Sequence, residues 1–197
     1  IYDECHHSNL DAPENLRIAQ SFQHVVGLSA TPWSPGSEQL FADSHRVSLP
    51  LFQAQREGLI APHEVVPWTE PAGPLALVFC ASNDECAARS RKDARSSWVG
   101  VQVPEPDRQE RIRRWKSGAI PVLYANRMLL EGFDEPRCPH VWLDKDTDSQ
   151  IMLVQMAGRA LRFRPGKVAR LYCASEETAD QLRAAMQRCN QPQLRLV

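Results

Sequence analysis

The chain has 197 residues and a formal net charge of −1, so it has room for one domain, or for one domain and part of another. Its 43% hydrophobic and 24% charged residues are ordinary for a soluble globular protein. No apolar run reaches the length of a membrane-spanning helix, so we expect no segment of this chain to span a membrane.

The start of the chain and its cysteines indicate an intracellular fragment. The sequence opens on Ile1-Tyr2-Asp3, with no initiator Met and no signal-peptide pattern. The six cysteines form no C-x-x-C pair. We therefore expect reduced thiols, a cytoplasmic protein, and a chain cut from something longer.

Charge is distributed unevenly along the sequence. Residues 1–88 carry 3 Lys and Arg against 11 Asp and Glu, whereas residues 89–197 carry 20 against 13. An acidic first part and a basic second part suit a protein whose anionic ligand lies mainly against the second. An ordinary solvated surface fits the same numbers, so charge alone does not distinguish it from an anion-binding surface, and the motifs are needed to choose.

The first sixty residues predict short strands and helices. In chain order these are strand Ile1–Tyr2, helix Asn15–Phe22, strand His24–Leu28, helix Glu38–Ala42, strand Arg46–Leu49 and helix Leu51–Arg56. Gly58 is expected to stop the last helix. Residues 61–74 contain four prolines. An edge strand at His63–Val66 still fits there, and Glu70–Pro74 is expected to be a linker or turn.

From Leu75 onward, short apolar strands alternate with helical segments. The strands are Leu75–Cys80, Trp98–Val103, Pro121–Ala125, Val141–Leu143 and Ala169–Cys173; the helices are Asp84–Arg95, Asp107–Lys116, Ser149–Arg162 and Glu176–Arg188. This alternation predicts an α/β fold, a parallel sheet with helices on both faces.

Polar residues follow several of these strands, and ligands of such sheets sit outside the carboxyl ends of the strands. The residues concerned are Asp3, Glu4, Ser29, Thr31, Asn126, Gly132 and Asp134. We therefore expect the functional site at this edge of the sheet.

Two groups of residues indicate phosphoryl transfer. The adjacent carboxylates Asp3 and Glu4 can hold Mg²⁺ through water and orient an attacking water. Gln155, Arg159 and Arg162 are spaced i, i+4, i+7, which predicts a polar stripe on one helix face. Arginine meets phosphate oxygens two at a time, and metal with arginines neutralises a leaving phosphate. A surface acidic pair and a salt-bridged surface stripe are the alternatives.

Five segments occur in a fixed order along the chain. They are Asp3-Glu4-Cys5-His6, Gly27-Leu28-Ser29-Ala30-Thr31-Pro32, Leu77-Val78-Phe79-Cys80-Ala81-Ser82, Glu131-Gly132-Phe133-Asp134 and Gln155-x-x-Gly158-Arg159-x-x-Arg162. In this order they resemble motifs II to VI of the superfamily 2 helicases, the nucleic-acid-dependent ATPases built from two RecA-like lobes. The first segment resembles the Walker B motif in its DExH-box form.

The resemblance implies a domain organisation and a branch of the family. Residues 1–60 would be the C-terminal part of a first RecA-like lobe, and residues 61–197 a complete second lobe. Asp-Glu-Cys-His-His at 3–7 and Gly-Leu-Ile-Ala-Pro at 58–62 resemble the type III restriction and DNA-repair helicases. Restriction or repair subunits are therefore candidate partners.

For the first lobe, the resemblance implies ATP and Mg²⁺ as cofactors. Asp3 would hold Mg²⁺ through water, and Glu4 would orient and deprotonate the attacking water. His6, Ser29 and Thr31 would couple hydrolysis to movement between the lobes. For Ser29 and Thr31, a turn closed by their own hydroxyls is the alternative.

For the second lobe, the resemblance implies contacts with the nucleotide. Gly132 and Asp134 would approach it across the cleft, with Asp134 on the ribose. Gln155, Arg159 and Arg162 would be catalytic, the arginines acting on the phosphates. A strand-end turn with a solvated carboxylate is the alternative for Asp134.

Ser82, Arg108, Asn126 and Arg127 are candidate contacts to a nucleic-acid backbone, DNA more than RNA. Such contacts position a protein without reading sequence. Asn126 stands where the family usually has Thr. A second set of basic residues is expected to belong to a solvated helix face instead: Arg111, Arg113, Arg114 and Lys116.

The sequence lacks a G-x-x-x-x-G-K-[ST] motif, the P-loop that cradles nucleotide phosphates. The first interpretation is therefore an ATP-dependent helicase or translocase in the parent protein, with this chain alone inactive. The alternative is a catalytically silent nucleic-acid-binding or scaffold module. A metabolic nucleotide-binding enzyme would need a G-x-G-x-x-G turn, and the sequence has none.

Overall fold

The computed structural model describes residues 21, 26, 29, 47–127, 129, 133–144, 147 and 149–190. The chain divides into two compact units, residues 51–188 and residues 1–50 together with 189–197. Every described helix and strand belongs to the first of these units. Several predicted elements lie mostly or wholly outside the described residues: Ile1–Tyr2, Asn15–Phe22, His24–Leu28 and Glu38–Ala42.

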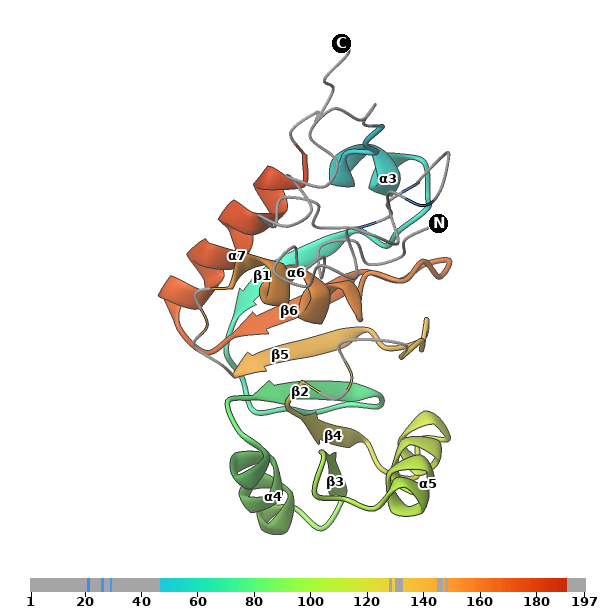
Figure 1. Cartoon of the computed structure of the whole chain (residues 1–197), viewed down its shortest axis with the longest axis vertical. Helices are drawn as coiled ribbons and strands as arrows, with labels where there is room; N and C mark the ends of the chain where they lie inside the picture. The colour runs from blue at the N-terminus through green and yellow to red at the C-terminus, as the bar shows by residue number, and fades with distance from the viewer. Residues whose placement is uncertain are drawn as a thin grey trace. The chain divides into compact units, whose positions relative to one another are not determined.

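Six parallel strands form one sheet in the order β1-β6-β5-β2-β4-β3 (Figure 1). The strands are β1 (His63–Pro67), β2 (Ala76–Cys80), β3 (Ser96–Val99), β4 (Val122–Ala125), β5 (His140–Asp144) and β6 (Ala169–Cys173). The edge position predicted for the first strand is confirmed. Pro67 fits there, because an edge strand can lack a ladder donor.

Helices pack on both faces of the sheet. They are α3 (Leu51–Arg56), α4 (Asn83–Lys92), α5 (Glu105–Lys116), α6 (Gln150–Gly158) and α7 (Glu176–Arg188). One buried cluster contains Trp115 of α5, Leu153 of α6 and Leu182 of α7. A second cluster contains Cys86 of α4. The predicted parallel sheet with helices on both faces is therefore confirmed.

The central strand β2 shows why the sheet forms. All five of its residues are buried. Leu77 and Phe79 belong to one cluster, whereas Val78 and Cys80 belong to the other. A continuous apolar run is what a parallel strand covered on both faces requires. Trp115 joins α5 to this strand, because its fully buried indole Nε1 donates to the carbonyl of Ala76 at 3.0 Å.

Three predicted elements have the observed bounds at both ends. Helices Leu51–Arg56 and Glu176–Arg188 and strand Ala169–Cys173 are confirmed as predicted. The helix predicted over Asp84–Arg95 ends at Lys92 instead. Asp93 then closes a turn by accepting from the amide of Ser96 at 2.9 Å.

Two predicted strands differ from the structure: one is shifted along the chain, and the other is not seen in its described residues. The strand predicted over Trp98–Val103 is observed at Ser96–Val99, because a turn follows in which Val103 N donates to Gly100 O at 3.0 Å. No strand occurs in the described part of Arg46–Leu49, residues 47–49. Gly58 has a φ of 70°, a left-handed conformation that favours glycine, and it does end α3 as predicted.

Candidate functional site

Two segments predicted to act on a nucleotide meet in the structure. Arg159, at the C-terminal end of α6, donates through Nη1 to the carbonyl of Phe133 at 2.5 Å. Arg162 Nε lies 3.3 Å from Asp134 Oδ1. The fold therefore brings Asp134, Arg159 and Arg162 together, although Asp134 is far from the two arginines in sequence.

The prediction that Arg162 continues the helix is wrong. Helix α6 ends at Gly158, and Arg162 forms an antiparallel bridge with Ile60. The amide of Ala61 also donates to the carbonyl of Leu161 at 2.8 Å. These contacts with residues 60 and 61 pull the chain into an extended conformation. Gln155, Arg159 and Arg162 are therefore not one helical stripe.

Gln155 lies on α6 one turn before Arg159 and is half-buried. Ser149 caps this helix, since its hydroxyl accepts from the amide of Met152 at 3.3 Å. The opposite side of α6 packs into the core through Leu153 and Met156. Packing and the cap thus fix the orientation of the helix that carries Gln155.

Lys116 is a basic residue at this site that the sequence analysis missed. It ends α5, and its Nζ donates to the carbonyl of Asp134 at 3.0 Å. The ammonium also lies 5.1 Å from the centre of the Phe133 ring. The assignment of Lys116 to a solvated face is therefore wrong. The sequence offered one signal for this role, a lysine directly after a core Trp. The residue that Lys116 contacts, Asp134, lies 18 residues away in sequence.

Arg111 is also not a solvated residue. Its Nη1 donates to the carbonyl of Trp98 at 2.8 Å, and its guanidinium lies 5.7 Å from the Trp98 ring centre. Arg113 does match the expectation, because its side chain is 71% exposed and pairs with Glu110 on the same helix. The basic residues of α5 thus have different environments.

The residues that follow Asp134 are held by further cations. The carboxylate of Glu135 is buried and pairs with Arg137, with Nε 2.7 Å from Oε1 and Nη2 2.8 Å from Oε2. This hydrogen bonding by Arg137 lowers the pKa of Glu135 below its ordinary value. Lys167 donates to the carbonyls of Pro136 and Cys138 at 2.8 and 3.2 Å. Burial lowers the pKa of Lys167.

A second group of predicted residues meets at the carboxyl ends of β2 and β4, which pair with each other. Ser82 caps α4, because its hydroxyl accepts from Glu85 N at 3.1 Å and Glu85 Oε2 accepts from Ala81 N at 3.1 Å. Asn126 Nδ2 donates to the carbonyl of Ala81 at 3.3 Å. Ser82 and Asn126 are therefore neighbours, as two contacts to one strand of nucleic acid would require.

The other two candidate nucleic-acid contacts differ in accessibility. Arg127 directly follows Asn126 and is exposed. Arg108 lies in the first turns of α5, is half-buried, and forms an ion pair with Glu105. Since that pair already satisfies part of its charge, Arg108 is less available to an anion than Arg127.

One group of metal-ligating types lies close together among the described residues: Cys80, Glu85 and Asp144. Arg89 contacts both carboxylates of this group, at 3.0 Å from Glu85 Oε1 and directly against Asp144. The guanidinium supplies the positive charge there, so the group is explained by ion pairing. The predicted Mg²⁺ residue, Asp3, lies outside the described residues.

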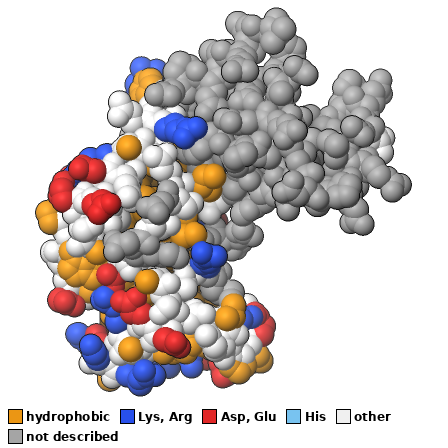
Figure 2. Space-filling view, turned by 60° about the vertical axis from the view of Figure 1, so that its left-hand side comes forward, with side chains coloured by type: hydrophobic (Ala, Val, Ile, Leu, Met, Phe, Trp, Pro, Cys, Tyr) orange, Lys and Arg blue, Asp and Glu red, His pale blue; other side chains and the backbone are white. Residues whose placement is uncertain are grey.

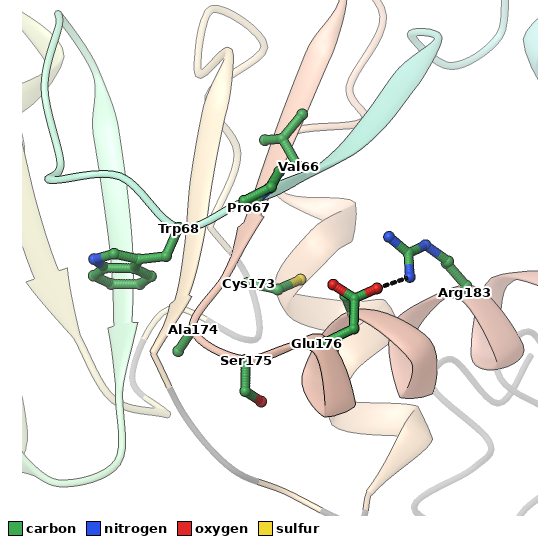
Figure 3. Close-up of a pocket in the computed structure, with 9 residues that line it drawn as sticks. Val66, Pro67, Trp68, Cys173, Ala174, Ser175, Glu176 and Arg183 are labelled. Carbon is green, nitrogen blue, oxygen red and sulfur yellow. Dashed lines mark hydrogen bonds and ion pairs between the residues drawn. The ribbon is translucent and has the colours of Figure 1, made fainter.

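The described surface shows no large patch of one charge on the face seen in Figure 2, where acidic and basic side chains are mixed. A cavity of about 120 Å³ opens beside the carboxyl ends of β1 and β6. Figure 3 shows the carboxylate of Glu176 facing the guanidinium of Arg183 at this cavity, and the two are 2.8 Å apart. Arg183 also pairs with Asp180, so it is satisfied without a ligand. The cavity contains none of the predicted site residues.

Several predicted site residues lie outside the described part of the chain: Asp3, Glu4, His6, Thr31 and Gly132. Ser29 is described as a single half-buried residue. Their roles stay predictions. The described helices include none long and apolar enough to cross a membrane.

The six-stranded parallel sheet with its helices is a RecA-like lobe of the kind found in helicase C-terminal domains. Residues 61–164 match the helicase conserved C-terminal domain, and the chain belongs to this family. No curated protein matched the sequence. The family assignment therefore rests on the domain match, and the similar solved structures support the fold.

Three of the similar solved structures illustrate the fold. A fragment of a type I restriction enzyme HsdR subunit from Vibrio vulnificus YJ016 has 18% identity and a TM-score of 0.65, over 93% of this chain and 44% of that one. The ATP-dependent type ISP restriction-modification enzyme LlaBIII, bound to DNA, has 14% sequence identity and a TM-score of 0.69, and the match covers 96% of this chain and 20% of that one. S. cerevisiae Dbp5, bound to RNA and ADP BeF3, has 14% sequence identity and a TM-score of 0.64, and the match covers 95% of this chain and 56% of that one. The chain thus spans about half or less of these proteins.

Proposed function

We propose that this chain is part of a superfamily 2 ATP-dependent helicase or translocase, a hydrolase that couples ATP hydrolysis to movement along nucleic acid. Residues 61–197 form its second RecA-like lobe, and residues 1–60 belong to the first. The observation that carries the proposal is that Arg162 pairs with Asp134 while Arg159 bonds the carbonyl of the preceding residue, Phe133. A carboxylate and two guanidinium groups in one place suit the ribose and phosphates of a nucleotide.

ATP and Mg²⁺ are the proposed cofactors. Arg159 and Arg162 face the phosphates, where a positioned arginine is worth on the order of 10³–10⁵ in rate. Gln155 lies on the same helix and assists them. Asp3 holds Mg²⁺ through water and Glu4 activates the attacking water. In the present fold Arg159 donates through Nη1 to the Phe133 carbonyl, and a guanidinium carries further N–H groups that can meet phosphate oxygens.

DNA is the proposed track. Ser82, Asn126 and Arg127 lie at adjacent strand ends, and they contact phosphates without reading bases. Support for DNA comes from the DNA-bound restriction enzyme with the same fold. RNA is the alternative, because the RNA-bound Dbp5 shares the fold as well.

The finer assignment follows the sequence motifs. The DExH-box form of the first motif favours the type III restriction and DNA-repair branch, with restriction or repair subunits as partners and a cytoplasmic location. His6, Ser29 and Thr31 couple hydrolysis to lobe movement. Support for a restriction context comes from two structural neighbours, which are restriction enzymes.

ATP hydrolysis by the full-length protein, with and without single- and double-stranded DNA and RNA, tests the proposal. We expect DNA to stimulate turnover, and Glu4→Gln and Arg159→Ala each to abolish it. Glu4→Gln should keep nucleotide binding, because the substitution removes only the base. Normal turnover by Glu4→Gln would contradict the role of Glu4, and normal turnover by Arg159→Ala would contradict the proposed site.

A catalytically silent nucleic-acid-binding module is the second candidate. The absence of a P-loop motif from these 197 residues favours it. We expect this chain alone to bind nucleic acid without hydrolysing ATP at a meaningful rate. If the full-length protein behaves in the same way, binding DNA without turnover, the silent module is the correct function.

A further inference from the structure

The C-terminal end of α5 packs against the backbone that carries Asp134. The Trp115 ring lies 5.6 Å from the Phe133 ring, centre to centre. Lys116 Nζ donates to the Asp134 carbonyl at 3.0 Å. In return, Arg137 Nη2 donates to the carbonyl of Lys116 at 2.9 Å. These contacts link α5 to the 133–138 segment at three points.

From the other side, α6 holds the same segment. Arg159 donates to the carbonyl of Phe133, the residue before Asp134. Two consecutive carbonyls, those of Phe133 and Asp134, thus each accept a hydrogen bond from a cation on a different helix. With both carbonyls fixed, the Asp134 carboxylate points to Arg162, from which it is 3.3 Å distant.

The chemistry explains why cations occupy these positions. Residues 133–138 belong to no helix or strand, so their backbone carbonyls need partners from elsewhere. A hydrogen bond from a charged donor is about twice as strong as one between neutral groups. The ammonium of Lys116 also gains from its position over the Phe133 ring.

We propose that Lys116 is a positioning residue that sets the Asp134 carboxylate for its ligand. Lys116 touches no nucleotide itself and acts through the Asp134 backbone. The inference rests on the proposed function only in taking that ligand to be the ribose of ATP. The hold of Lys116 on the 133–138 segment is a property of the fold and can be measured without any ligand.

The first experiment measures amide hydrogen exchange in the 197-residue chain. The amides of Arg137 and Cys138 are the reporters, because they donate to Glu135 at 3.1 and 3.0 Å. Lys116→Met keeps the aliphatic stem and removes the charge. We expect it to speed exchange at both reporters about ten-fold, the size that loss of one charged hydrogen bond corresponds to. Lys116→Arg should restore most of the protection.

Arg113→Met is the matched control. Arg113 lies on α5 one turn earlier, and its exposed side chain pairs with Glu110 on the same helix. We expect this variant to exchange like the wild type at both reporters. Equal exchange in Lys116→Met and the wild type would overturn the proposal. So would equally faster exchange in Arg113→Met, because a general loosening of α5 would then explain both.

The second experiment measures ATP hydrolysis by the full-length protein. We expect Lys116→Met and Asp134→Ala each to raise the KM for ATP about ten-fold, with a smaller effect on kcat. The double variant should be no worse than Asp134→Ala, because Lys116 acts only through that residue. Effects that multiply in the double variant would overturn the proposal. If the wild type does not hydrolyse ATP, the proposed function fails, and the exchange experiment still decides the role of Lys116.

Discussion

Arg162 Nε lies 3.3 Å from Asp134 Oδ1, and both side chains are more than half exposed, at 52% and 63%. Exposed ion pairs contribute about 0–1 kcal/mol to folding. Stability therefore does not account for the placement of these two residues. The proposed site, at which a third, anionic group approaches Arg162, would account for it.

Arg162→Ala should lower the free energy of unfolding by less than about 1 kcal/mol, measured by urea denaturation of the 197-residue chain. The same substitution should abolish ATP hydrolysis by the full-length protein, because it removes a phosphate-facing charge. Arg183→Ala is a control, since Arg183 also forms exposed ion pairs but lies on α7. Full turnover by Arg162→Ala would contradict the proposed role.

Gly100→Ala should destabilise the fold by about 1–3 kcal/mol, the usual cost of overpacking. A methyl group at Gly100 would lie 2.6 Å from Asn83 Oδ1 and 2.9 Å from Trp98 Cζ3. The Trp98 ring is stiff, and Asn83 begins α4, so neither can move freely. Urea denaturation of the 197-residue chain measures the change.

Gly158→Ala is the matched substitution for this test. Gly158 ends α6, and among the described residues no atom outside its own helix and chain neighbours lies within 4 Å of a methyl group placed there. Alanine there should raise the free energy of unfolding by up to about 0.5–1 kcal/mol, because it restricts the unfolded chain more than glycine does. Equal effects of the two substitutions would show that the contact with Asn83 and Trp98 is unimportant.

The parts of the fold that could be predicted have local causes. Helix α7 begins at Glu176 as predicted, because Ser175 caps it by accepting from Thr178 N at 3.1 Å. Strand β6 alternates buried residues with exposed or half-buried ones over its predicted length. In both cases residues close together in sequence determine the element, so its bounds can be predicted from a single sequence.

The parts that could not be predicted depend on contacts between distant residues. The sequence spacing of Arg159 and Arg162 favours a continued helix, yet Arg162 forms a bridge with Ile60 instead. Lys116 looks like any charged residue at a helix end, and only the packed fold places Asp134 beside it. The candidate site was therefore predicted in its residue types, but not in its backbone or its supporting lysine.

Glu135→Gln should lower the free energy of unfolding at pH 7 by about 1–2 kcal/mol, less than a fully buried charged pair because Arg137 is 47% exposed. The folded-state pKa of Glu135 is lowered by Arg137. Its contribution is thus complete above the unfolded value of 4.5 and is lost as pH falls through the folded value. Urea denaturation at pH 7 and below pH 4 should show the wild type and variant converging in acid. A constant difference across this range would contradict the assignment.

Arg127→Ala should weaken nucleic-acid binding without changing stability, because Arg127 is exposed and follows the strand end that carries Asn126. If Arg127 contacts one phosphate, the slope of log affinity against log salt should fall by about 0.9 for duplex DNA. Fluorescence anisotropy of the 197-residue chain with labelled duplexes of two unrelated sequences, at several salt concentrations, measures both effects. The loss should be equal for the two sequences, because phosphate contacts carry no base information.

Arg95→Ala is the matched control: Arg95 is 81% exposed but precedes β3, at the opposite ends of the strands. An equal loss of affinity in Arg95→Ala would show that overall charge, rather than the edge formed by β2 and β4, governs binding.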